Sequence, residues 1–382
     1  MPVVLAPLTC GYAVSGHRGR VADQGDSREA SGIDPRPQRG GRISASLRSL
    51  REQSRPPDSV VVVSDNSTDK TVELASAAGV RVMETAGNTA MKAGALNQAL
   101  EHLLPDLDVD DALLVMDADS RIDADFLEVA EEHLLSDSTL GAVGGIFFGE
   151  SGGGLLGQLQ RNEFLRYSRD IERHRGRVMV LTGTASVIRV QAMREVAAAR
   201  AKHLPGVPGQ VYDTAALTED NEFTLALKTL GWRLRSPAPC RVTTEIMTGW
   251  NELWWQRLRW QRGALENLRH YGITRTTLRY WGQQAGIAIG AVALSLYVLL
   301  LAITAVVGGW AVRPLWITVG VIFIAERVTT VWRGGWRARA LALPLVIELA
   351  YDLFIQAVFV RSLIDLLTGR AARWHRAQTD PV

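Results

Sequence analysis

The sequence predicts an α/β domain followed by a C-terminal α-helical transmembrane region. Two observations divide the 382-residue chain in this way. Its first part alternates short apolar runs with stretches of helical periodicity, which is typical of a sheet covered by helices. Its long apolar stretches all follow position 284, and a chain of this length usually forms more than one domain. We therefore expect a soluble domain and a membrane part.

Strands and helices alternate in the prediction for residues 43–116. A helix with apolar residues at 43, 47 and 50 ends before Pro56 and Pro57, and the apolar run 60–63 follows as a buried strand. The pattern then repeats with a helix over 71–78, a strand over 80–83, a helix over 92–104 and a strand over 112–116. Ligands of such sheets gather at the C-terminal ends of the strands, where Asp65 and Asp117 lie.

Apolar stretches of the second part are candidate membrane segments. The first, 285–312, has no charged residue and is longer than the roughly 20 residues that a spanning helix needs. A buried helix of a soluble core is the alternative. The second, 315–331, is shorter and carries Glu326 and Arg327 near its end.

A third apolar stretch, 341–367, either spans the membrane or lies flat at its surface. Glu348, Asp352 and Gln356 recur in it every four residues, so they share one helical face, which should contact protein or the interface. Ten of the eleven Trp residues lie at or after Trp250, which suits a region docked at the headgroups.

Basic residues orient these segments. One cluster lies in the loop after the second segment (Arg333, Arg337 and Arg339), and another in the tail 368–382 (Arg370, Arg373 and Arg376). The positive-inside tendency places the loop in the cytoplasm, on the same side as the α/β domain. We therefore expect a multi-pass protein of the cell membrane with a cytoplasmic domain. A third segment that spans would put the basic tail outside, against that tendency.

Composition excludes other classes. The net charge is +2, and the arginines cluster beside apolar segments instead of forming a stripe, so no nucleic-acid partner is expected. The two cysteines, Cys10 and Cys240, have neither a disulfide framework nor metal-ligand spacing.

Two acidic residues form the string DAD at 117–119. Asp117 and Asp119 flank one residue directly after a predicted strand, so both carboxylates can face a single cation that bridges a diphosphate. Acidic loops after strands are common, so the string alone is a weak metal signal.

Two polar strings accompany the other strands. Asp65, in SDNSTDKT at 64–71, could accept hydrogen bonds from a uracil or a ribose, although an Asx-type turn that caps the next helix explains it equally well. Lys92 begins a helix, where it could offset diphosphate charge or could simply be solvated.

Two further strings follow. Gly183 and Thr184 belong to GTASV, a small-residue turn after an expected apolar strand VMVL at 178–181. This turn could admit an acceptor sugar or could be only a tight turn. Glu219 and Asp220, in TED at 218–220, precede an apolar helical stretch, for which helix capping is the structural explanation.

The string QRLRW at 256–260 is the most specific signal. Gln256, Arg259 and Trp260 lie in a Trp-rich segment, 250–284, that we expect to form amphipathic interface helices. A membrane-surface helix with snorkelling arginines is the alternative. A guanidinium suits a diphosphate because its fork pairs phosphate oxygens in a fixed geometry.

Taken in this order along the chain, the four strings SDNSTDKT, DAD, TED and QRLRW resemble the membrane-integrated family 2 glycosyltransferases, which include the cellulose, chitin and hyaluronan synthases. The resemblance runs from about Arg42 to about Trp374. It implies a GT-A-like nucleotide-sugar-binding domain over 42–249, membrane-embedded helices over 285–367, and a UDP-sugar donor.

The resemblance also implies roles for the residues singled out above. Asp119 and Asp117 would hold Mg or Mn, and Asp220 would be the general base. The expected donor contacts are Asp65, Lys92, Asp117, Gln256 and Arg259, and the expected acceptor contacts are Gly183, Thr184, Glu219 and Trp260. Transfer would be an in-line displacement that inverts the anomeric carbon, with the diphosphate leaving against the metal, Arg259 and Lys92.

Residues 1–41 depart from the family pattern. They lack the opening strand that ends in a Pro-Ala-X-Asn-Glu-like string, and their composition predicts no folded element and no signal peptide. Codons that fit IDPRPQRGG at 33–41, when they are read one base on, give SIPAHNEEA, which is the missing string. We hypothesise that one base has been lost near codons 41 and 42, so that 1–41 is out-of-frame translation. A real mutation of this kind would predict an inactive product.

Two functions remain open at this level. One is a membrane-bound glycosyltransferase that acts on a polysaccharide, glycolipid or cell-envelope acceptor, either processively or in single steps. The other is a degenerate, non-catalytic transferase that serves as a membrane scaffold. Membrane lipid, a nucleotide-sugar and a carbohydrate or lipid-linked acceptor are the expected partners of the enzyme.

Overall fold

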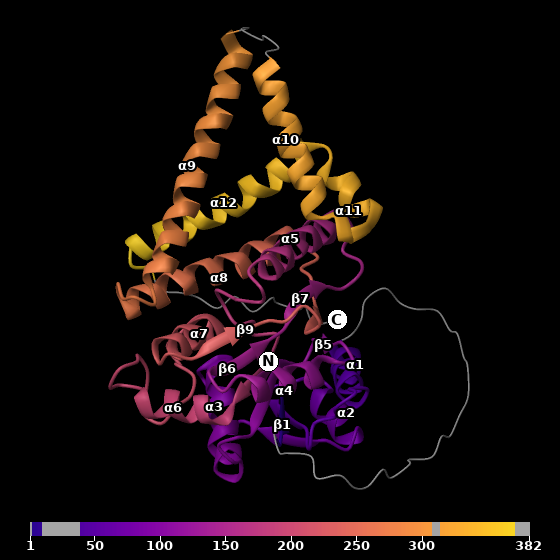
Figure 1. Cartoon of the computed structure of the whole chain (residues 1–382), viewed down its shortest axis with the longest axis vertical. Helices are drawn as coiled ribbons and strands as arrows, with labels where there is room; N and C mark the ends of the chain where they lie inside the picture. Colours follow the sequence, from indigo (N-terminus) through magenta and orange to yellow (C-terminus); the bar gives the residue numbers. More distant parts are fainter. Residues whose placement is uncertain (1, 10–38, 308–313, 371–382) are drawn as a thin grey trace, which may run out of the picture.

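The computed structural model describes residues 2–9, 39–307 and 314–370. Its α/β domain, in the lower part of Figure 1, is built on a seven-stranded sheet, and the strands lie in the spatial order β3-β2-β1-β4-β8-β6-β9. In chain order the strands are β1 (Val3–Leu8), β2 (Val61–Ser64), β3 (Arg81–Glu84), β4 (Ala112–Asp117), β6 (Leu140–Gly144), β8 (Ala185–Arg189) and β9 (Arg233–Arg235). The predicted strands at 60–63, 80–83 and 112–116 are confirmed within one residue at each end.

Helices cover both faces of this sheet, which confirms the α/β class. One face is covered by α1 (Arg39–Arg51), α2 (Thr71–Ala77) and α4 (Phe126–Ser136), and the other by α3 (Met91–Leu103), α6 (Val190–Ala199) and α7 (Glu219–Thr229). A 3₁₀ turn η1 (Leu104–Asp106) follows α3. Side chains alternate along each strand, so that Val3 joins the core under α3 whereas Val4 joins the core under α1.

The first strand corrects the prediction for residues 1–41. Residues 3–8 form β1, a fully buried strand between β2 and β4, and α1 already begins at Arg39. The apolar run VVLAPL is long enough for a buried strand, but the polar composition of 1–41 as a whole concealed it. The rest of that segment lies outside the described residues, and the reading-frame hypothesis stays a prediction.

The direction of β1 also differs from the expected parallel arrangement. It runs antiparallel to both neighbours, with Val3 opposite Val63 on one side and Asp117 on the other. The amino end of β1 therefore lies at the edge where β2 and β4 end. The amide of Ala118 donates a hydrogen bond to the carbonyl of Pro2 there, over 3.4 Å.

The expected strand VMVL at 178–181 is wrong. These residues lie outside any strand, and the strand begins later, at Ala185. The ammonium of Lys228 donates hydrogen bonds to the carbonyls of Val178 and Met179, over 2.7 and 2.9 Å. A lysine thus satisfies backbone groups that a neighbouring strand would otherwise have paired.

A small second sheet supplies the strands that precede two long helices. It consists of β5 (Arg121–Ile122), β10 (Arg241–Thr244) and β7 (Ile146–Gly149). The long helix α5 (Gly154–Arg173) follows β7 and packs on it, with the rings of Phe147 and Phe164 edge to face at 4.8 Å. Helix α8 (Trp250–Tyr271) begins shortly after β10.

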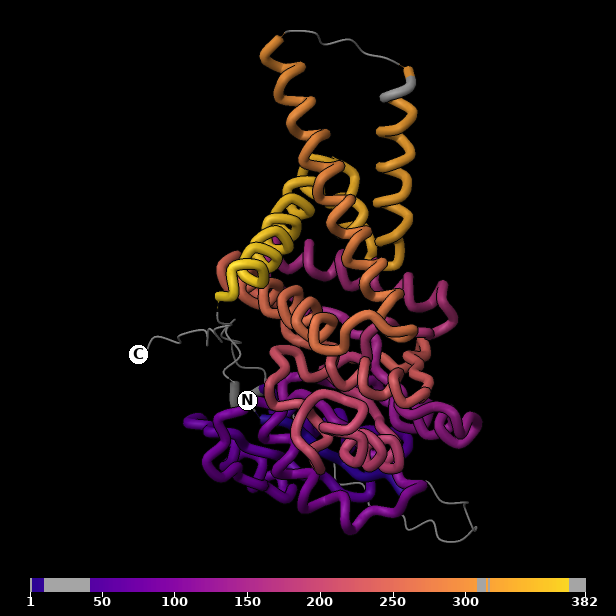
Figure 2. Tube along the Cα trace, turned by 90° about the vertical axis from the view of Figure 1, so that its left-hand side faces the viewer, coloured from indigo at the N-terminus to yellow at the C-terminus, as the bar shows by residue number. Residues whose placement is uncertain are grey.

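Two helices extend away from the α/β domain, as Figure 2 shows. They are α9 (Leu278–Val307) and α10 (Pro314–Thr330). Among the described residues, α9 is the one single helix that is long and apolar enough to cross a membrane. Its side chains Ile289, Leu296 and Ile303 are more than half exposed, as expected for a surface that faces lipid.

The third apolar stretch does not continue as one straight helix. After α10 come a 3₁₀ turn η2 (Trp332–Gly334), α11 (Gly335–Ala342) and α12 (Leu345–Leu367), with a bend of 96° between α11 and α12. Pro344 stands at the break, where it removes a helical hydrogen bond.

Helix α12 lies along α8 (Figure 1), and the choice between a span and a flat arrangement stays a prediction. The ring of Phe354 packs against Trp250 and Trp254, at centroid distances of 5.1 and 5.7 Å. Glu348 is buried and forms an ion pair with Arg166 on α5, over 2.8 Å. The prediction that the acidic face of this stretch contacts protein is confirmed for Glu348, and Asp352 likewise pairs with Arg327.

Candidate active site

A buried lysine joins the strand ends of the α/β domain. Lys92 lies in the first turn of α3, and its ammonium is 2.6 Å from Oδ1 of Asp117 at the end of β4. The same nitrogen is 3.1 Å from Oε1 of Glu219 and donates to the carbonyl of Gly183 over 3.0 Å. The Lys92 ammonium therefore contacts groups from three other parts of the sequence.

Asp220 is held beside this cation by backbone amides. Its Oδ2 accepts a hydrogen bond from the Gly183 amide over 3.1 Å, and its Oδ1 accepts one from Asn221 over 2.7 Å. The Asp117 amide donates to the carbonyl of Thr184 over 2.9 Å. Gly183 and Thr184, directly before β8, therefore fix the two acids through their backbone, whereas the rest of the predicted turn GTASV belongs to the strand.

Burial and charge separate the two acids of the TED string. Burial raises the pKa of Asp220 to about 6, and the adjacent Glu219 carboxylate acts in the same direction. Burial alone would also raise the pKa of Glu219, but attraction to Lys92 and Arg259 outweighs it, so that the pKa of Glu219 is lowered. Asp220 is therefore the better proton acceptor of the two, and Glu219 stays ionised.

The surroundings of these groups leave little room for water. A cavity of only about 20 Å³ adjoins Lys92 and Asp220, and its walls include Leu96 and Phe223. Burial would by itself lower the pKa of Lys92, but Asp117 and Glu219 raise it above its usual value. The lysine thus stays charged inside the domain.

A second acidic group lies on the other side of Asp117. Burial, Asp117 and Glu245 together raise the pKa of Asp119 to about 7, against the attraction of Arg42. Arg42 on α1 forms an ion pair with Glu245. Sequence reasoning missed both Arg42 and Glu245, because an isolated arginine and glutamate carry no motif.

The acidic pair fits a cation that the substrate helps to bind. Among residues 2–9, 39–307 and 314–370, no three His, Cys, Asp or Glu side chains converge on a metal position. Mg²⁺, however, is commonly held by one or two carboxylates together with substrate phosphates. A divalent cation at Asp117 and Asp119 would relieve the repulsion that raises the pKa of Asp119.

Asp65 follows β2 and forms the centre of a polar group. Its Oδ1 accepts hydrogen bonds from Asn88 over 2.8 Å, Thr85 over 2.9 Å and Asn66 over 3.0 Å. Thr85 and Asn88 come from the loop after β3, and only the parallel pairing of β2 and β3 could have revealed them. The alternative role in a local turn is also present, since the Thr71 amide at the start of α2 bonds Asp69.

The QRLRW string lies on helix α8, close to the carboxylates of Glu219 and Asp220. Arg259 is close enough to attract the carboxylates of Glu219 and Asp220. This attraction acts against the rise in pKa that burial causes in both acids. Gln256 accepts a hydrogen bond from Arg257 over 2.9 Å. The structure therefore brings Arg259 to the TED acids, while Gln256 is oriented by its neighbour on the helix.

Arg257, which the sequence did not single out, orients Trp260. Its guanidinium lies 4.3 Å from the centroid of the Trp260 ring and donates to Glu163 on α5 over 2.9 Å. Glu163 in turn accepts a hydrogen bond from the hydroxyl of Tyr351 on α12 over 2.6 Å. A chain of contacts therefore connects α12 with the Trp260 ring.

Comparison with known families finds a match for the first part of the α/β domain. Residues 38–197 match the family model described as glycosyl transferase family 2. This stretch, which is less than half of the chain, is similar to a family 2 glycosyltransferase domain. The matched residues include Asp65, Lys92 and the DAD string, whereas TED and QRLRW lie beyond them.

Relatives and a solved structure agree with this assignment. The chain is 27% identical over 235 residues to the poly-beta-1,6-N-acetyl-D-glucosamine synthases of Staphylococcus aureus strains COL and MSSA476, which covers 58% of the chain and 51% of each synthase. The chain thus spans about half the length of these relatives. A mannosyltransferase from Pyrobaculum calidifontis, solved with GDP-Man and Mn2+, shares the fold with a TM-score of 0.55 at 19% identity, over 86% of this chain and 84% of that one.

Proposed function

We propose that the chain is a membrane-bound inverting glycosyltransferase that moves a sugar from a UDP-sugar to a hydroxyl of a polysaccharide, glycolipid or cell-envelope acceptor. The observation that carries the proposal is the position of Asp220. This acid lies beside Lys92, Glu219 and Arg259, and its pKa is raised to about 6. A carboxylate of this pKa is ionised at neutral pH and can accept a hydroxyl proton.

The other residues take the roles that the family resemblance implies. Asp65 binds the nucleotide, and Lys92, Gln256 and Arg259 bind the diphosphate. Asp117 and Asp119 would hold Mg or Mn, which when bound neutralises diphosphate charge. Glu219, the turn at Gly183 and Thr184, and the Trp260 ring form the acceptor side.

The reaction then needs one proton transfer and one displacement. Asp220 takes the proton of the acceptor hydroxyl while the oxygen attacks the anomeric carbon from the face opposite the diphosphate. Lys92 and Arg259 stabilise the negative charge that develops on the leaving diphosphate. A single displacement inverts the configuration at the anomeric carbon.

The membrane part supports placement of this chemistry at a membrane surface. We propose that α9 and α10 form a spanning pair, with the α/β domain and the basic loop of Arg333, Arg337 and Arg339 in the cytoplasm. Helix α12 would lie at the interface, because it packs along α8 and its face with Glu348 is paired with protein. An acceptor held at the membrane would then reach the Trp260 end of the site.

The experiment is UDP release by the purified full chain in nanodiscs, tested with a panel of UDP-sugars, Mg²⁺ or Mn²⁺, and a membrane extract as acceptor. Replacement of Asp220 by Asn should lower the rate by roughly 10²- to 10⁴-fold, which is the usual contribution of a general base. Product length separates processive synthesis from single transfer.

The rival function, a non-catalytic scaffold, is less well supported, since Lys92, Asp220 and Arg259 still meet in one site. No UDP release with any sugar in the panel would favour it. UDP release that survives the Asp220→Asn change would instead remove Asp220 as the base.

A further inference from the structure

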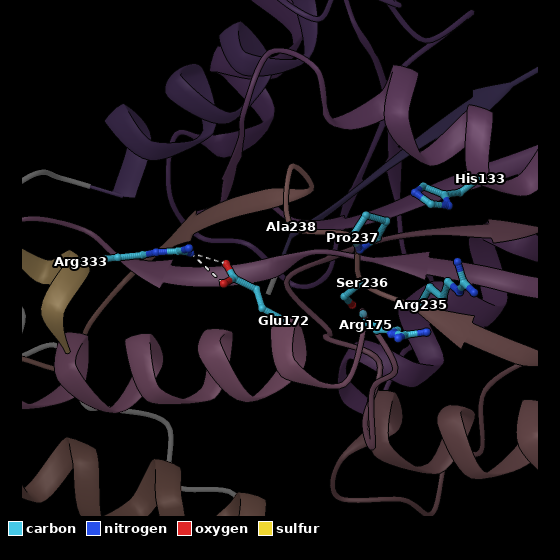
Figure 3. Close-up of a pocket in the computed structure, with 9 residues that line it drawn as sticks. His133, Glu172, Arg175, Arg235, Ser236, Pro237, Ala238 and Arg333 are labelled. Carbon is cyan, nitrogen blue, oxygen red and sulfur yellow. Dashed lines mark hydrogen bonds and ion pairs between the residues drawn. The ribbon is translucent and has the colours of Figure 1, made fainter. Parts of the chain in front are cut away.

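A basic cavity lies apart from the carboxylate site (Figure 3). Its volume is about 380 Å³, which lies in the range of small-ligand pockets. Its basic side chains come from four elements: His133 on α4, Arg175 in the turn after α5, Arg235 on β9 and Arg333 in η2. The cavity therefore forms where the α/β domain meets the turn between α10 and α11.

Its lining carries an excess of positive charge. Glu172 is the one acid among the lining residues, and both of its carboxylate oxygens already accept hydrogen bonds from Arg333 over 2.8 Å, as Figure 3 shows. Within the described residues, no carboxylate forms an ion pair with Arg175 or Arg235. Asp137, whose pKa is lowered in part by attraction to Arg235, does not line the cavity, so an anion bound there would face two guanidinium groups that form no ion pair.

Arg235 is the half-buried guanidinium of the cavity. Its Nε is buried and has no hydrogen-bond partner among the described residues, so this atom has no surface open to the cavity. Guanidinium groups match phosphate oxygens with two parallel hydrogen bonds, and a phosphate in the cavity would pair with the terminal nitrogens of Arg235.

A role at the end of a helix explains only one of the arginines that line the cavity. Arg175 follows the C-terminus of α5, where a cation stabilises the helix dipole. This explanation does not extend to Arg235, which lies on a strand, or to Arg333, which comes from the membrane-proximal turn.

We infer that this cavity binds a phosphate or diphosphate group at a site separate from the donor site, with Arg175 and Arg235 as its principal contacts. The group belongs either to the headgroup of an anionic lipid or to a free phosphorylated compound. Arg333 lies in η2, between α10 and α11, so an occupied cavity ties the α/β domain to that turn.

The test is calorimetric titration of the full chain with inorganic pyrophosphate in phosphatidylcholine nanodiscs. Saturating UDP is present to occupy the proposed donor site, and divalent cations are absent. The double change Arg175→Ala and Arg235→Ala should weaken pyrophosphate binding at least tenfold. Arg233→Ala is the matched control, because Arg233 lies on the same strand but pairs with Asp137 over 3.2 Å and does not line the cavity.

A second arm identifies the source of the phosphate. In nanodiscs with one part phosphatidylglycerol to two parts phosphatidylcholine, a lipid headgroup would compete, so pyrophosphate binding by the unchanged chain should weaken while UDP binding does not. A free compound predicts equal pyrophosphate binding in both discs. The anionic disc surface could also repel pyrophosphate without any lipid in the cavity, but that repulsion would weaken UDP binding too.

Three results would overturn the inference. They are the absence of pyrophosphate binding, equal binding by the double variant, and an equal loss in the Arg233→Ala control. Thermal unfolding of each variant verifies that the domain still folds. Little loss of stability is expected, because Arg175 is exposed and Arg235 is only half-buried.

Discussion

Lys92 and Asp117 form an ion pair of 2.6 Å that joins the start of α3 to the end of β4 inside the α/β domain. The lysine is 8% exposed, and it also contacts Glu219 at 3.1 Å. One cation therefore holds two acids that lie far apart in the sequence. Its loss would leave both acids buried without their partner.

The change Lys92→Met should therefore destabilise the protein strongly. Removal of one partner from a buried ion pair costs on the order of 3–5 kcal/mol, because an uncompensated charge remains. The measurement is thermal unfolding of the full chain in detergent. Lys202→Met, at an exposed position, is the matched control and should unfold like the unchanged chain. Equal stability of the two variants would contradict the buried pair.

The rate of sugar transfer should rise with pH through about 6 and then level off. Asp220 accepts a proton only as a carboxylate, and its pKa is raised to about 6 by burial and by Glu219. Below that pH the acid is protonated and cannot act as the base. The measurement is the pH profile of kcat/KM for UDP release, which reports the free enzyme.

Replacement of Glu219 by Gln should move this profile to lower pH. The change removes a negative charge beside Asp220, so the carboxylate form of Asp220 becomes easier to reach. It also frees Lys92 to attract Asp220 more strongly, which acts in the same direction. A profile that stays in place or moves to higher pH would argue against Asp220 as the titrating group.

The sequence predicted the alternation of strands and helices well because apolar runs and helical periodicity are local signals. Residues 60–63, 80–83 and 112–116 each became a strand of the sheet. The polar composition of residues 1–41 concealed β1, and its antiparallel pairing could not be predicted because strand direction is not a local signal. The prediction of a strand for VMVL at 178–181 was wrong for a related reason. Lys228 donates hydrogen bonds to the carbonyls of Val178 and Met179, and the sequence does not show that contact.

The site was predicted where a residue belongs to a string, and missed where its role depends on a neighbour in space. Lys92, Asp117, Glu219 and Asp220 came from strings, and the structure places them together. Asn88 beside Asp65 and Arg257 beside Trp260 have no string of their own. Their contacts arise only after the strands pair and α8 packs on α5.

Replacement of Gly183 by Ala should lower the rate without loss of folding. A Cβ at this position would lie 3.0 Å from Oδ2 of Asp220 and 3.2 Å from its Cβ, so the acid must shift. A displacement of about 1 Å at a reacting group can cost roughly 100-fold in rate, and a smaller shift here should cost about tenfold. Gly286→Ala, where the added carbon meets open space, is the control. Equal rates in the two variants would show that Asp220 tolerates the displacement.

The contacts from α12 to Trp260 should govern binding of the acceptor. Arg257→Lys keeps the charge near Glu163 but removes the flat guanidinium that lies 4.3 Å from the Trp260 ring centroid. Stacking of this kind is worth about 0.5–2 kcal/mol, so the KM for the acceptor should rise several-fold while the KM for the donor changes little.

Tyr351→Phe tests the same contacts from the far end, because it removes only the hydroxyl that bonds Glu163 over 2.6 Å. A smaller rise in the acceptor KM is expected, since Arg257 and Glu163 remain paired. Arg269→Lys, at an exposed position on α8, should leave both KM values unchanged. A fall in kcat with both KM values unchanged would mean that Arg257 does not act through Trp260, and that α12 is connected to the site only by packing.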